Sequence, residues 1–293
     1  MVVIPTFGGG RELGDLIKNV YGQGRPPGCT IRVVVVENGT QNCGETATSE
    51  GATYIHVARA NASNARNVGA ESEASPDVLV FVDDDVIPRE GWLAALISPL
   101  AEGAAQAVVG AVVVNTEEPV SANIRRRFVD TATAMNPEAP FLAGLNMAVQ
   151  ANVFRDLGGF DDRLGPGTRA SGGEDVLLGM ALTRSGGHIA WAPEAIVEHV
   201  VPASRLTQAA LLRRAAAEGR ADAWIIHHWH QSSPAWLIIR VIRSALWKLG
   251  ADLDPRGGHQ ERQLVANTRL SRDRDLLCYQ HPILGIGDGV ERY

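Results

Sequence analysis

The stretch "VLVFVDDDVIPREGW", Val78 to Trp92, is the part of the sequence that most strongly indicates the fold. Five apolar residues run directly into three consecutive carboxylates, Asp83, Asp84 and Asp85. A short apolar run rich in β-branched and aromatic side chains is typical of a buried strand. Because adjacent anions repel one another, a buried strand that ends in this way predicts a cation beside its carboxylates.

Similar apolar runs precede this stretch and alternate with helix-like segments. The expected strands are Val2–Pro5, Ile31–Val36, Thr53–Val57 and Val78–Val82, and the expected helices are Arg11–Tyr21 and Asn64–Ser72. Near-continuous apolar strands separated by helices indicate an α/β fold with a mainly parallel central sheet flanked by helices. Such sheets bind ligands beyond the carboxyl ends of their strands. We therefore expect Thr6, Glu37 and the aspartates to lie close together at that end of the sheet.

The pattern continues less regularly after the aspartates. A helix is expected at Trp92–Leu100, a strand at Ala107–Val114, a helix at Glu174–Arg184, and short strands at His188–Trp191 and Ala195–Val200. From Arg205 onward the chain is arginine-rich and helical in character. We therefore expect an α/β domain over residues 1–203 and a helical C-terminal extension over residues 204–293.

The extension contains one segment with two interpretations. Residues 233–250, "SPAWLIIRVIRSALWKLG", have a cap, an early proline and a terminal glycine, which together predict a helix. The segment is too short and too basic to span a bilayer. It could lie flat on a membrane surface, or pack on the core or in a homodimer interface. The tail, residues 252–293, mixes charge, glycine and proline, and we expect it to be loosely ordered or a partner-binding arm.

Composition limits the partners. The chain has 293 residues and a formal net charge of −6, which argues against a nucleic-acid partner because no broad basic field is present. Three scattered cysteines, Cys29, Cys43 and Cys278, indicate neither a disulfide framework nor a cysteine-ligated zinc. The start of the sequence lacks a signal-peptide pattern. We expect a cytoplasmic protein, with peripheral contact at the inner face of the membrane left open.

The aspartate run has the composition of a metal site. Asp83 and Asp85 are two residues apart, so their side chains leave the same face of an extended chain. Carboxylate oxygens suit a hard divalent ion such as magnesium or manganese, which usually also holds substrate phosphates. A solvated aspartate-rich turn would look the same. Acidic residues and a histidine further along the chain, Glu174-Asp175 and His199, favour the metal site.

Seven sequence blocks, in order, resemble the family-2 glycosyltransferases, which have the GT-A fold. The blocks are "VVIPTF", "VVVVENGT", "NASNARNVGAE", "FVDDDVIPREGW", "LAGLNMAV" with "LGGFDDRL", "GGEDVLLGMAL" and "AIVEH". They extend over roughly Val2 to Val200, about two-thirds of the chain. The resemblance implies a nucleotide-sugar transferase.

The resemblance also implies roles for individual residues. The nucleotide and its sugar would be bound by the residues at the ends of the first strands and on the following helix: Pro5, Thr6, Glu37, Asn38, Arg66, Asp83 and Asp84. Asp85 and His199 would ligate manganese or magnesium. The family usually has aspartate where Glu37 stands, so this sequence departs from the family pattern at the expected base contact.

Asp175 would be the catalytic base, with Glu174 orienting the acceptor or sharing the base role. A single displacement at the sugar carbon would invert the anomeric configuration. No QxxRW motif follows, so one transfer without processive synthesis is expected. A UDP-sugar is the expected donor, and a glycan, a lipid-linked sugar or a small molecule the acceptor.

Three alternatives stay open. A haloacid-dehalogenase-like phosphatase would use Asp83 as a covalent nucleophile, because Asp83–Ile87 nearly fits its motif. A non-catalytic nucleotide-sugar-binding subunit would keep the fold without turnover. A nucleotidyltransferase would use a glycine-rich loop with a basic residue, for which Gly8-Gly9-Gly10-Arg11 is the candidate.

Overall fold

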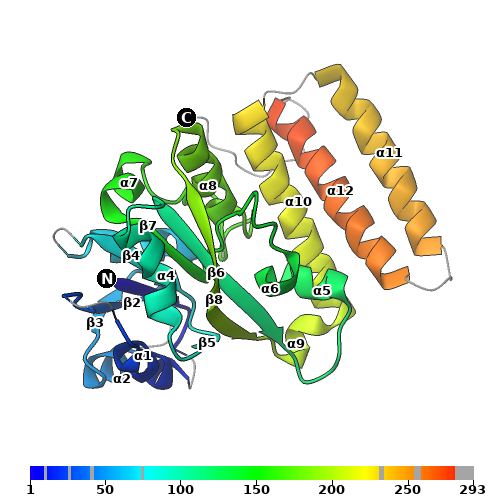
Figure 1. The fold of residues 1–293 in the computed structure, drawn as a ribbon. Coiled ribbons are helices and arrows are strands. Elements are labelled where there is room, and N and C mark those ends of the chain that lie inside the picture. Colours follow the sequence, from blue (N-terminus) through cyan, green and yellow to red (C-terminus); the bar gives the residue numbers. More distant parts are fainter. Residues whose placement is uncertain are drawn as a thin grey trace. The chain divides into compact units, whose positions relative to one another are not determined.

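A computed structural model describes residues 1–9, 12–25, 28–39, 43–73, 76–230, 234–253 and 259–280. The chain divides into two compact units. The first contains Met1–Gly167 and Glu174–Ala203. The second contains Thr168–Gly173 and the described residues from Ser204 onward. The elements of each unit are labelled in Figure 1.

The first unit is built on one eight-stranded sheet with the order β3-β2-β1-β4-β7-β6-β8-β5. Its strands are β1 (Val2–Thr6), β2 (Val33–Glu37), β3 (Thr53–His56), β4 (Val78–Val82), β5 (Val86–Pro88), β6 (Ala107–Asn115), β7 (Asn146–Gln150) and β8 (Ile189–Val200). Strands β3, β2, β1 and β4 are parallel, as are β6 and β8. The pairs β4–β7, β6–β7 and β5–β8 are antiparallel. The mainly parallel sheet expected from the sequence is therefore confirmed, with an antiparallel insertion at β7.

Helices cover both faces of this sheet. They are α1 (Leu13–Gly22), α2 (Gly44–Ser49), α3 (Ala62–Glu71), α4 (Trp92–Ala101), α5 (Ala122–Arg127), α6 (Thr131–Ala134), α7 (Ala151–Asp156) and α8 (Glu174–Arg184). The expected helices at Arg11–Tyr21, Asn64–Ser72, Trp92–Leu100 and Glu174–Arg184 correspond to α1, α3, α4 and α8. The short helices and the strands β5 and β7 were not expected.

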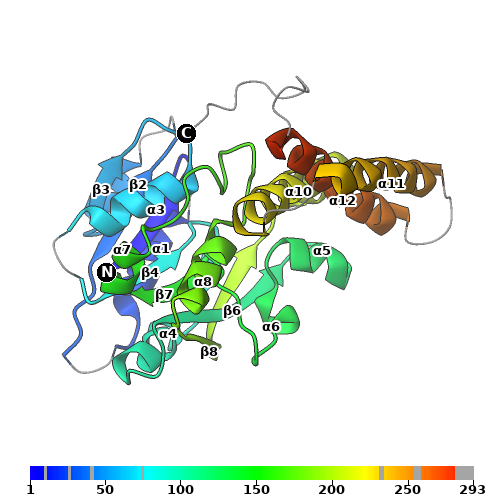
Figure 2. The ribbon, with the colours of Figure 1, turned by 90° about the horizontal axis from the view of Figure 1, so that it is seen from above.

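The alternation of side chains along β4 shows that α3 and α7 lie on one face of the sheet and α4 on the other. Phe81 of β4 packs against Phe154 of α7 and against Phe160, with ring centroids 5.3 and 5.0 Å apart. The next residue, Val82, pairs with Asn146 of β7, whose side chain accepts a hydrogen bond from Trp92 of α4 at 2.8 Å. Because successive residues of a strand point to opposite faces, α7 and α4 lie on opposite sides (Figure 2).

One buried asparagine stabilises an irregular pairing between β6 and β8. The parallel pairing of β6 and β8 shifts register between Gly110 and Ala111. The Asn146 amide donates to the backbone carbonyls of Ala111 and Ala195, at 2.9 and 2.8 Å, on the two sides of this irregularity. The two strands expected at His188–Trp191 and Ala195–Val200 are therefore one long strand, β8, because the chain passes through a bulge without leaving the sheet.

The second unit is helical, with α9 (Ala203–Leu206) at the junction followed by α10 (Gln208–His230), α11 (Pro234–Leu253) and α12 (His259–Gln280). The last three lie side by side (Figure 1). At the crossing of α10 and α12, a side chain on Gly219 would come within 2.1 Å of the Thr268 carbonyl, so this glycine permits the close approach. None of the described helices combines the length and apolar content needed to cross a bilayer.

The expectation of a loosely ordered tail was wrong for residues 259–280, which form α12. Three polar residues of α12, Ser271, Asp273 and Asp275, are buried, so the sequence has no clear apolar periodicity there. Asp273 accepts a hydrogen bond from Ser244 of α11 at 2.6 Å and pairs with Arg272. Buried polar groups that are paired in this way are compatible with a packed helix.

Candidate functional site

The carboxyl ends of β1, β2 and β4 meet at one edge of the sheet, as the parallel order requires. Thr6 at the end of β1 is in register with Glu37 at the end of β2. The backbone N–H of Asn38 donates to the Thr6 carbonyl at 2.8 Å, and Pro5 pairs with Val36 one step before. The hydroxyl of Thr6 donates to the Asp84 carboxylate. Three strand ends therefore form one polar edge.

Glu37 is fully buried at this edge. Its Oε2 accepts hydrogen bonds from the Tyr54 hydroxyl at 2.6 Å and from the Cys43 backbone N–H at 3.0 Å. Burial alone would raise the pKa of Glu37, but these hydrogen bonds outweigh it and leave the pKa below its ordinary value. Burial and the Glu37 carboxylate together raise the pKa of Tyr54 to about 12. Glu37 is therefore an ionised group held inside the edge.

Two buried acceptors at the end of β2 lack hydrogen-bond partners among the described residues. They are Oε1 of Glu37 and Oδ1 of Asn38. Buried acceptors without partners are uncommon in native proteins. The segment after Asn38 includes residues 40–42, and Gly10 and Arg11 of the glycine-rich loop also lie outside the described residues.

Asp84, the middle residue of the acidic run, is half-buried. Burial raises the pKa of Asp84 to about 6. The hydrogen bond from Thr6 opposes this rise, whereas the negative charges of Asp85 and Asp83 add to it. The three aspartates thus go to different partners: Asp84 to Thr6, and its two neighbours to the groups described next.

Asp85 lies against His199 in what we term the histidine corner, formed by these two residues and the Phe128 carbonyl. Nε2 of His199 is 3.3 Å from Oδ2 of Asp85, and its Nδ1 is 2.9 Å from the Phe128 carbonyl oxygen. A carbonyl only accepts, so Nδ1 carries the proton and donates it. In neutral His199 the Nε2 lone pair therefore faces Asp85. Strand pairing fixes this geometry, because Val86 is in register with His199.

The backbone beside this corner is strained. Val129 has φ 62°, a left-handed conformation that is unfavourable for a β-branched residue. It lies between Phe128, whose carbonyl binds His199, and Asp130, whose carboxylate accepts from Arg125 at 2.8 Å. Such strain persists only where surrounding contacts impose it, and it is often found at functional sites.

Asp83 belongs to a second group, the arginine cluster, formed by Arg66, Asp83, Glu174 and Asp175. One guanidinium nitrogen of Arg66 is 2.6 Å from Asp83 and the other is 2.9 Å from Glu174. The Arg66 side chain is only 2% exposed. Burial would lower the pKa of Arg66, but Asp83 and Glu174 outweigh it and raise the pKa. A permanent cation thus lies between the end of β4 and the start of α8.

The two carboxylates at the start of α8 have different environments. Glu174 is buried, and its Oε2 has no hydrogen-bond partner among the described residues. Asp175 is half-buried and accepts from the backbone N–H groups of Gly144 and Val176, each at 2.8 Å. Burial raises the pKa of Asp175, although these two N–H donors oppose the rise. Burial also raises the pKa of Glu174, and the charge of Asp175 adds to it.

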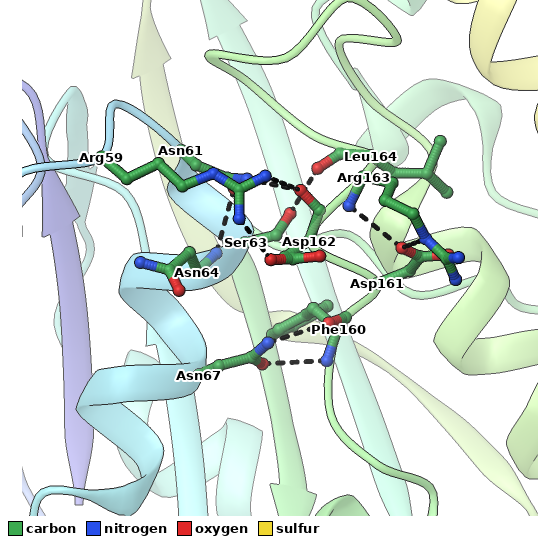
Figure 3. Close-up of polar contacts among 10 residues, drawn as sticks. All are labelled: Arg59, Asn61, Ser63, Asn64, Asn67, Phe160, Asp161, Asp162, Arg163 and Leu164. Carbon is green, nitrogen blue, oxygen red and sulfur yellow. Dashed lines mark hydrogen bonds and ion pairs between the residues drawn. The ribbon is translucent and has the colours of Figure 1, made fainter. Parts of the chain in front are cut away.

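Residues that the sequence analysis did not single out hold this arrangement together. Ser63 and Asn67 on α3 bind the loop 160–164: the Ser63 hydroxyl donates to the Leu164 carbonyl at 2.8 Å, and the Asn67 amide makes two bonds, of 2.8 and 2.9 Å, to the backbone of Phe160. The amide of Asn61, the N-cap of α3, donates to the Asp162 carbonyl (Figure 3). The signal was present, since Asn61, Ser63 and Asn67 all fall in the "NASNARNVGAE" block.

The histidine corner fits a divalent metal better than the arginine cluster does. Among the described residues, no group of three or more His, Cys, Asp or Glu is arranged to hold a metal ion. Asp85 and His199 supply one oxygen and one nitrogen, with the histidine oriented by a backbone carbonyl as metal-bound histidines usually are. Such a pair suits an ion that completes its coordination with substrate oxygens.

Comparison with known proteins gives a consistent result. The model of the family described as "Glycosyl transferase family 2" matches residues 1–158. The pre-mycofactocin glycosyltransferase of Mycobacterium tuberculosis is 27% identical over 211 residues, which cover 68% of this chain and 42% of that protein. The chain thus matches less than half the length of this relative. The succinoglycan biosynthesis protein ExoM of Rhizobium meliloti is 26% identical over 239 residues, covering 78% of this chain and 75% of that protein.

A solved structure agrees in fold. The mannosyltransferase PcManGT from Pyrobaculum calidifontis, in complex with GDP-Man and Mn2+, superposes with a TM-score of 0.61 at 19% identity, over 94% of this chain and 86% of that chain. At this identity the likeness concerns the fold, which is the GT-A fold expected from the sequence. The phosphatase alternative has no support here, because Asp83 is bound by Arg66 and the matching family is a different one.

Proposed function

Because the chain belongs to glycosyl transferase family 2, we propose that it transfers a sugar from a nucleotide-diphosphate donor to an acceptor hydroxyl. The transfer depends on Mn²⁺ or Mg²⁺, inverts the anomeric configuration and is non-processive. Residues 1–203 carry this activity, and residues 204–293 form a helical extension. The donor is a UDP-sugar, with GDP-mannose the second candidate because PcManGT was solved with it.

The observation that carries the proposal is the geometry of the histidine corner. Nε2 of His199 and Oδ2 of Asp85 lie 3.3 Å apart, and the Phe128 carbonyl fixes the ring. This pair would hold the metal, whose positive charge would offset the negative charge of the leaving diphosphate. Thr6 and Asp84 adjoin the corner at the ends of β1 and β4, where they would contact the nucleotide sugar together with Pro5, Glu37 and Asn38.

Asp175 is the group best suited to accept the acceptor's proton. Two backbone N–H donors fix its carboxylate, and its partial exposure lets a hydroxyl approach. Glu174 is less accessible, because it is buried and bound to Arg66. An acceptor oxygen that attacks opposite the leaving diphosphate inverts the sugar carbon in one displacement, while its proton passes to Asp175.

The decisive experiment is a panel of nucleotide sugars screened by thermal unfolding with and without Mn²⁺. A bound donor raises the melting temperature in proportion to the logarithm of its concentration over its dissociation constant. We expect one donor class to stabilise the protein only when metal is present. The stabilising donor is then incubated with candidate acceptors, and the anomeric configuration of the product is determined.

Two outcomes would contradict the proposal. Metal-dependent donor binding without transfer or slow hydrolysis would favour a non-catalytic nucleotide-sugar-binding subunit. Pyrophosphate release from a nucleoside triphosphate would favour a nucleotidyltransferase.

The outer face of α11 is a contact surface in this proposal. Ile242, Leu246 and Leu249 are 56, 63 and 56% exposed, and they follow one another at helical spacing with Arg243 beside them. An exposed apolar stripe with adjacent positive charge suits an anionic membrane surface, where a lipid-linked acceptor would be found. Flotation with vesicles of anionic lipid, comparing the intact chain with Leu246→Glu, tests this. If the intact chain does not bind the vesicles and its molecular mass in solution is that of a dimer, a homodimer is favoured instead.

A further inference from the structure

Arg66 has a position that a donor ligand could not reach directly. Its guanidinium is buried, and both terminal nitrogens are already in ion pairs, with Asp83 at 2.6 Å and Glu174 at 2.9 Å. A side chain built on Gly144 would come within 3.2 Å of its Cζ, so the Gly144 backbone closes one side. The Phe160 ring lies 5.7 Å from its Cζ on another. Because the Arg66 side chain is only 2% exposed, its guanidinium offers no open surface to a diphosphate.

The helix that carries Arg66 is fixed to the loop 160–164 by polar contacts. Ser63 and Asn67, four residues apart on α3, bind the backbone of Leu164 and Phe160. Asn61 caps the helix by accepting from the Asn64 N–H at 3.0 Å, and its amide also holds the Asp162 carbonyl (Figure 3). These contacts fix the height and rotation of α3, and therefore where the guanidinium reaches.

Arg66 joins the two sides of the proposed reaction. On one side it holds Asp83, two residues before the proposed metal ligand Asp85. On the other it holds Glu174, the neighbour of Asp175. It also packs on Gly144, whose N–H donates to the Asp175 carboxylate at 2.8 Å. A planar guanidinium binds two carboxylates at fixed angles, which a lysine ammonium does not reproduce.

We propose that Arg66 is a positioning residue, which sets the Asp175 carboxylate relative to the aspartates at the end of β4 and does not itself bind the donor. The inference rests on the proposed function. It replaces the expectation, taken from the family resemblance, that Arg66 binds the nucleotide sugar. It also gives the two carboxylates at the start of α8 different roles: Glu174 pairs with Arg66, and Asp175 contacts the acceptor.

Steady-state kinetics of Arg66→Lys test the proposal. We expect kcat to fall about 10- to 100-fold, because a small misplacement of a reacting group is costly, while the donor KM changes by less than about threefold. The acid limb of the kcat profile should move to higher pH. The charged groups around Asp175 are Arg66, Glu174 and, beyond the guanidinium, Asp83. When lysine replaces Arg66 and pairs less well with these carboxylates, Asp175 experiences more of their negative charge, which raises its pKa. Arg59→Lys, an exposed arginine paired with Asp162, is the matched control and should change neither quantity.

A second measurement does not depend on activity. In Arg66→Met the buried Glu174 carboxylate loses the guanidinium that lies 2.9 Å from it, so the melting temperature should fall more at pH 8, where Glu174 is more fully ionised, than at pH 5. The double variant Arg66→Met/Glu174→Gln removes one of the charges and should recover part of the loss at pH 8. Both variants are compared by thermal unfolding of the full chain without ligands.

The outcomes separate this inference from the proposed function. If Arg66→Lys raises the donor KM with kcat and its pH profile unchanged, Arg66 is a donor contact and the inference is overturned. If the loss of melting temperature in Arg66→Met is the same at both pH values, the ion-pair network is not what Arg66 maintains, and the inference again fails. If no donor is ever transferred, the proposed function fails, whereas the pH-dependent unfolding still reports on Arg66.

Discussion

The arginine cluster and the histidine corner are built from neighbouring aspartates, yet they handle negative charge in different ways. Asp83 is neutralised by Arg66, a cation that belongs to the fold and is almost wholly buried. Asp85, two residues later, meets the imidazole of His199, which is held by the Phe128 carbonyl. The acidic run therefore has two environments. Its first residue is paired with a cation that belongs to the fold, while its last residue lies beside His199 in the proposed metal site.

The alternation of a strand explains how the run is divided. Asp83 continues the direction of Phe81, toward the face covered by α3 and α7. The chain then turns directly into β5, where Val86 pairs with His199. Asp84, between them, is held by Thr6 of β1. Two cations thus offset the three adjacent carboxylates: the guanidinium of Arg66, which belongs to the fold, and the proposed metal ion.

The largest effect should come from the proposed base beside the arginine cluster. Asp175→Asn keeps the shape of the side chain but cannot accept a proton, so kcat should fall about 10²- to 10⁴-fold. Metal-dependent donor binding, measured by thermal shift, should be unchanged. Asp162→Asn, an exposed aspartate paired with Arg59, is the matched control. Full activity in Asp175→Asn would assign the base elsewhere.

The next effect should appear at the histidine corner and leave the arginine cluster intact. His199→Gln removes the oriented Nε2, so the affinity for Mn²⁺ in the presence of donor should fall at least about tenfold. Titration followed by electron paramagnetic resonance of free Mn²⁺ measures this directly. His188→Gln changes an exposed histidine and should bind Mn²⁺ like the wild type. Equal affinity in His199→Gln would remove this residue from the metal site.

The pH dependence of stability should come from the arginine cluster. Burial raises the pKa of Glu174 above its ordinary value of 4.5, so the folded state binds this proton more tightly than the unfolded state does. The associated stability is complete below about pH 4 and is lost as the pH rises through the folded-state pKa. Glu174→Gln should therefore be more stable than the wild type at pH 8 and gain nothing at pH 4. Thermal unfolding at the two pH values measures the difference in stability between Glu174→Gln and the wild type. A gain in stability at pH 4 alone would contradict a raised pKa of Glu174.

The smallest effect should come from the contacts that fix α3. Ser63→Ala removes one hydrogen bond to the Leu164 carbonyl and leaves a buried acceptor, which should cost about 1–3 kcal/mol of unfolding free energy. Denaturant unfolding measures the loss. Ser98→Ala removes an exposed hydroxyl that donates to Glu102, the C-cap residue of α4, and should cost much less. Equal losses would show that the loop 160–164 is not held through Ser63.

Much of this protein could be predicted from local pattern. The apolar runs of β1, β2 and β4 and the order of the sequence blocks were sufficient to predict the α/β class and to suggest the family, because strand periodicity and turn chemistry are local properties. The same patterns placed Thr6, Glu37 and the aspartates at one edge, since parallel strands necessarily end together.

Other features depend on contacts between residues far apart in the chain. The partner of each aspartate depends on side chains more than ten residues away, such as Arg66 for Asp83 and His199 for Asp85, and no local pattern encodes such pairing. The same holds for α12, whose buried Asp273 and Asp275 look like surface residues until Ser244 and the arginines are in place. The sequence by itself determined where the main strands lie, the order of the family blocks and the acidic residues at the strand ends. Only the tertiary structure decided which carboxylate receives a cation from within the fold, because that depends on burial and distance.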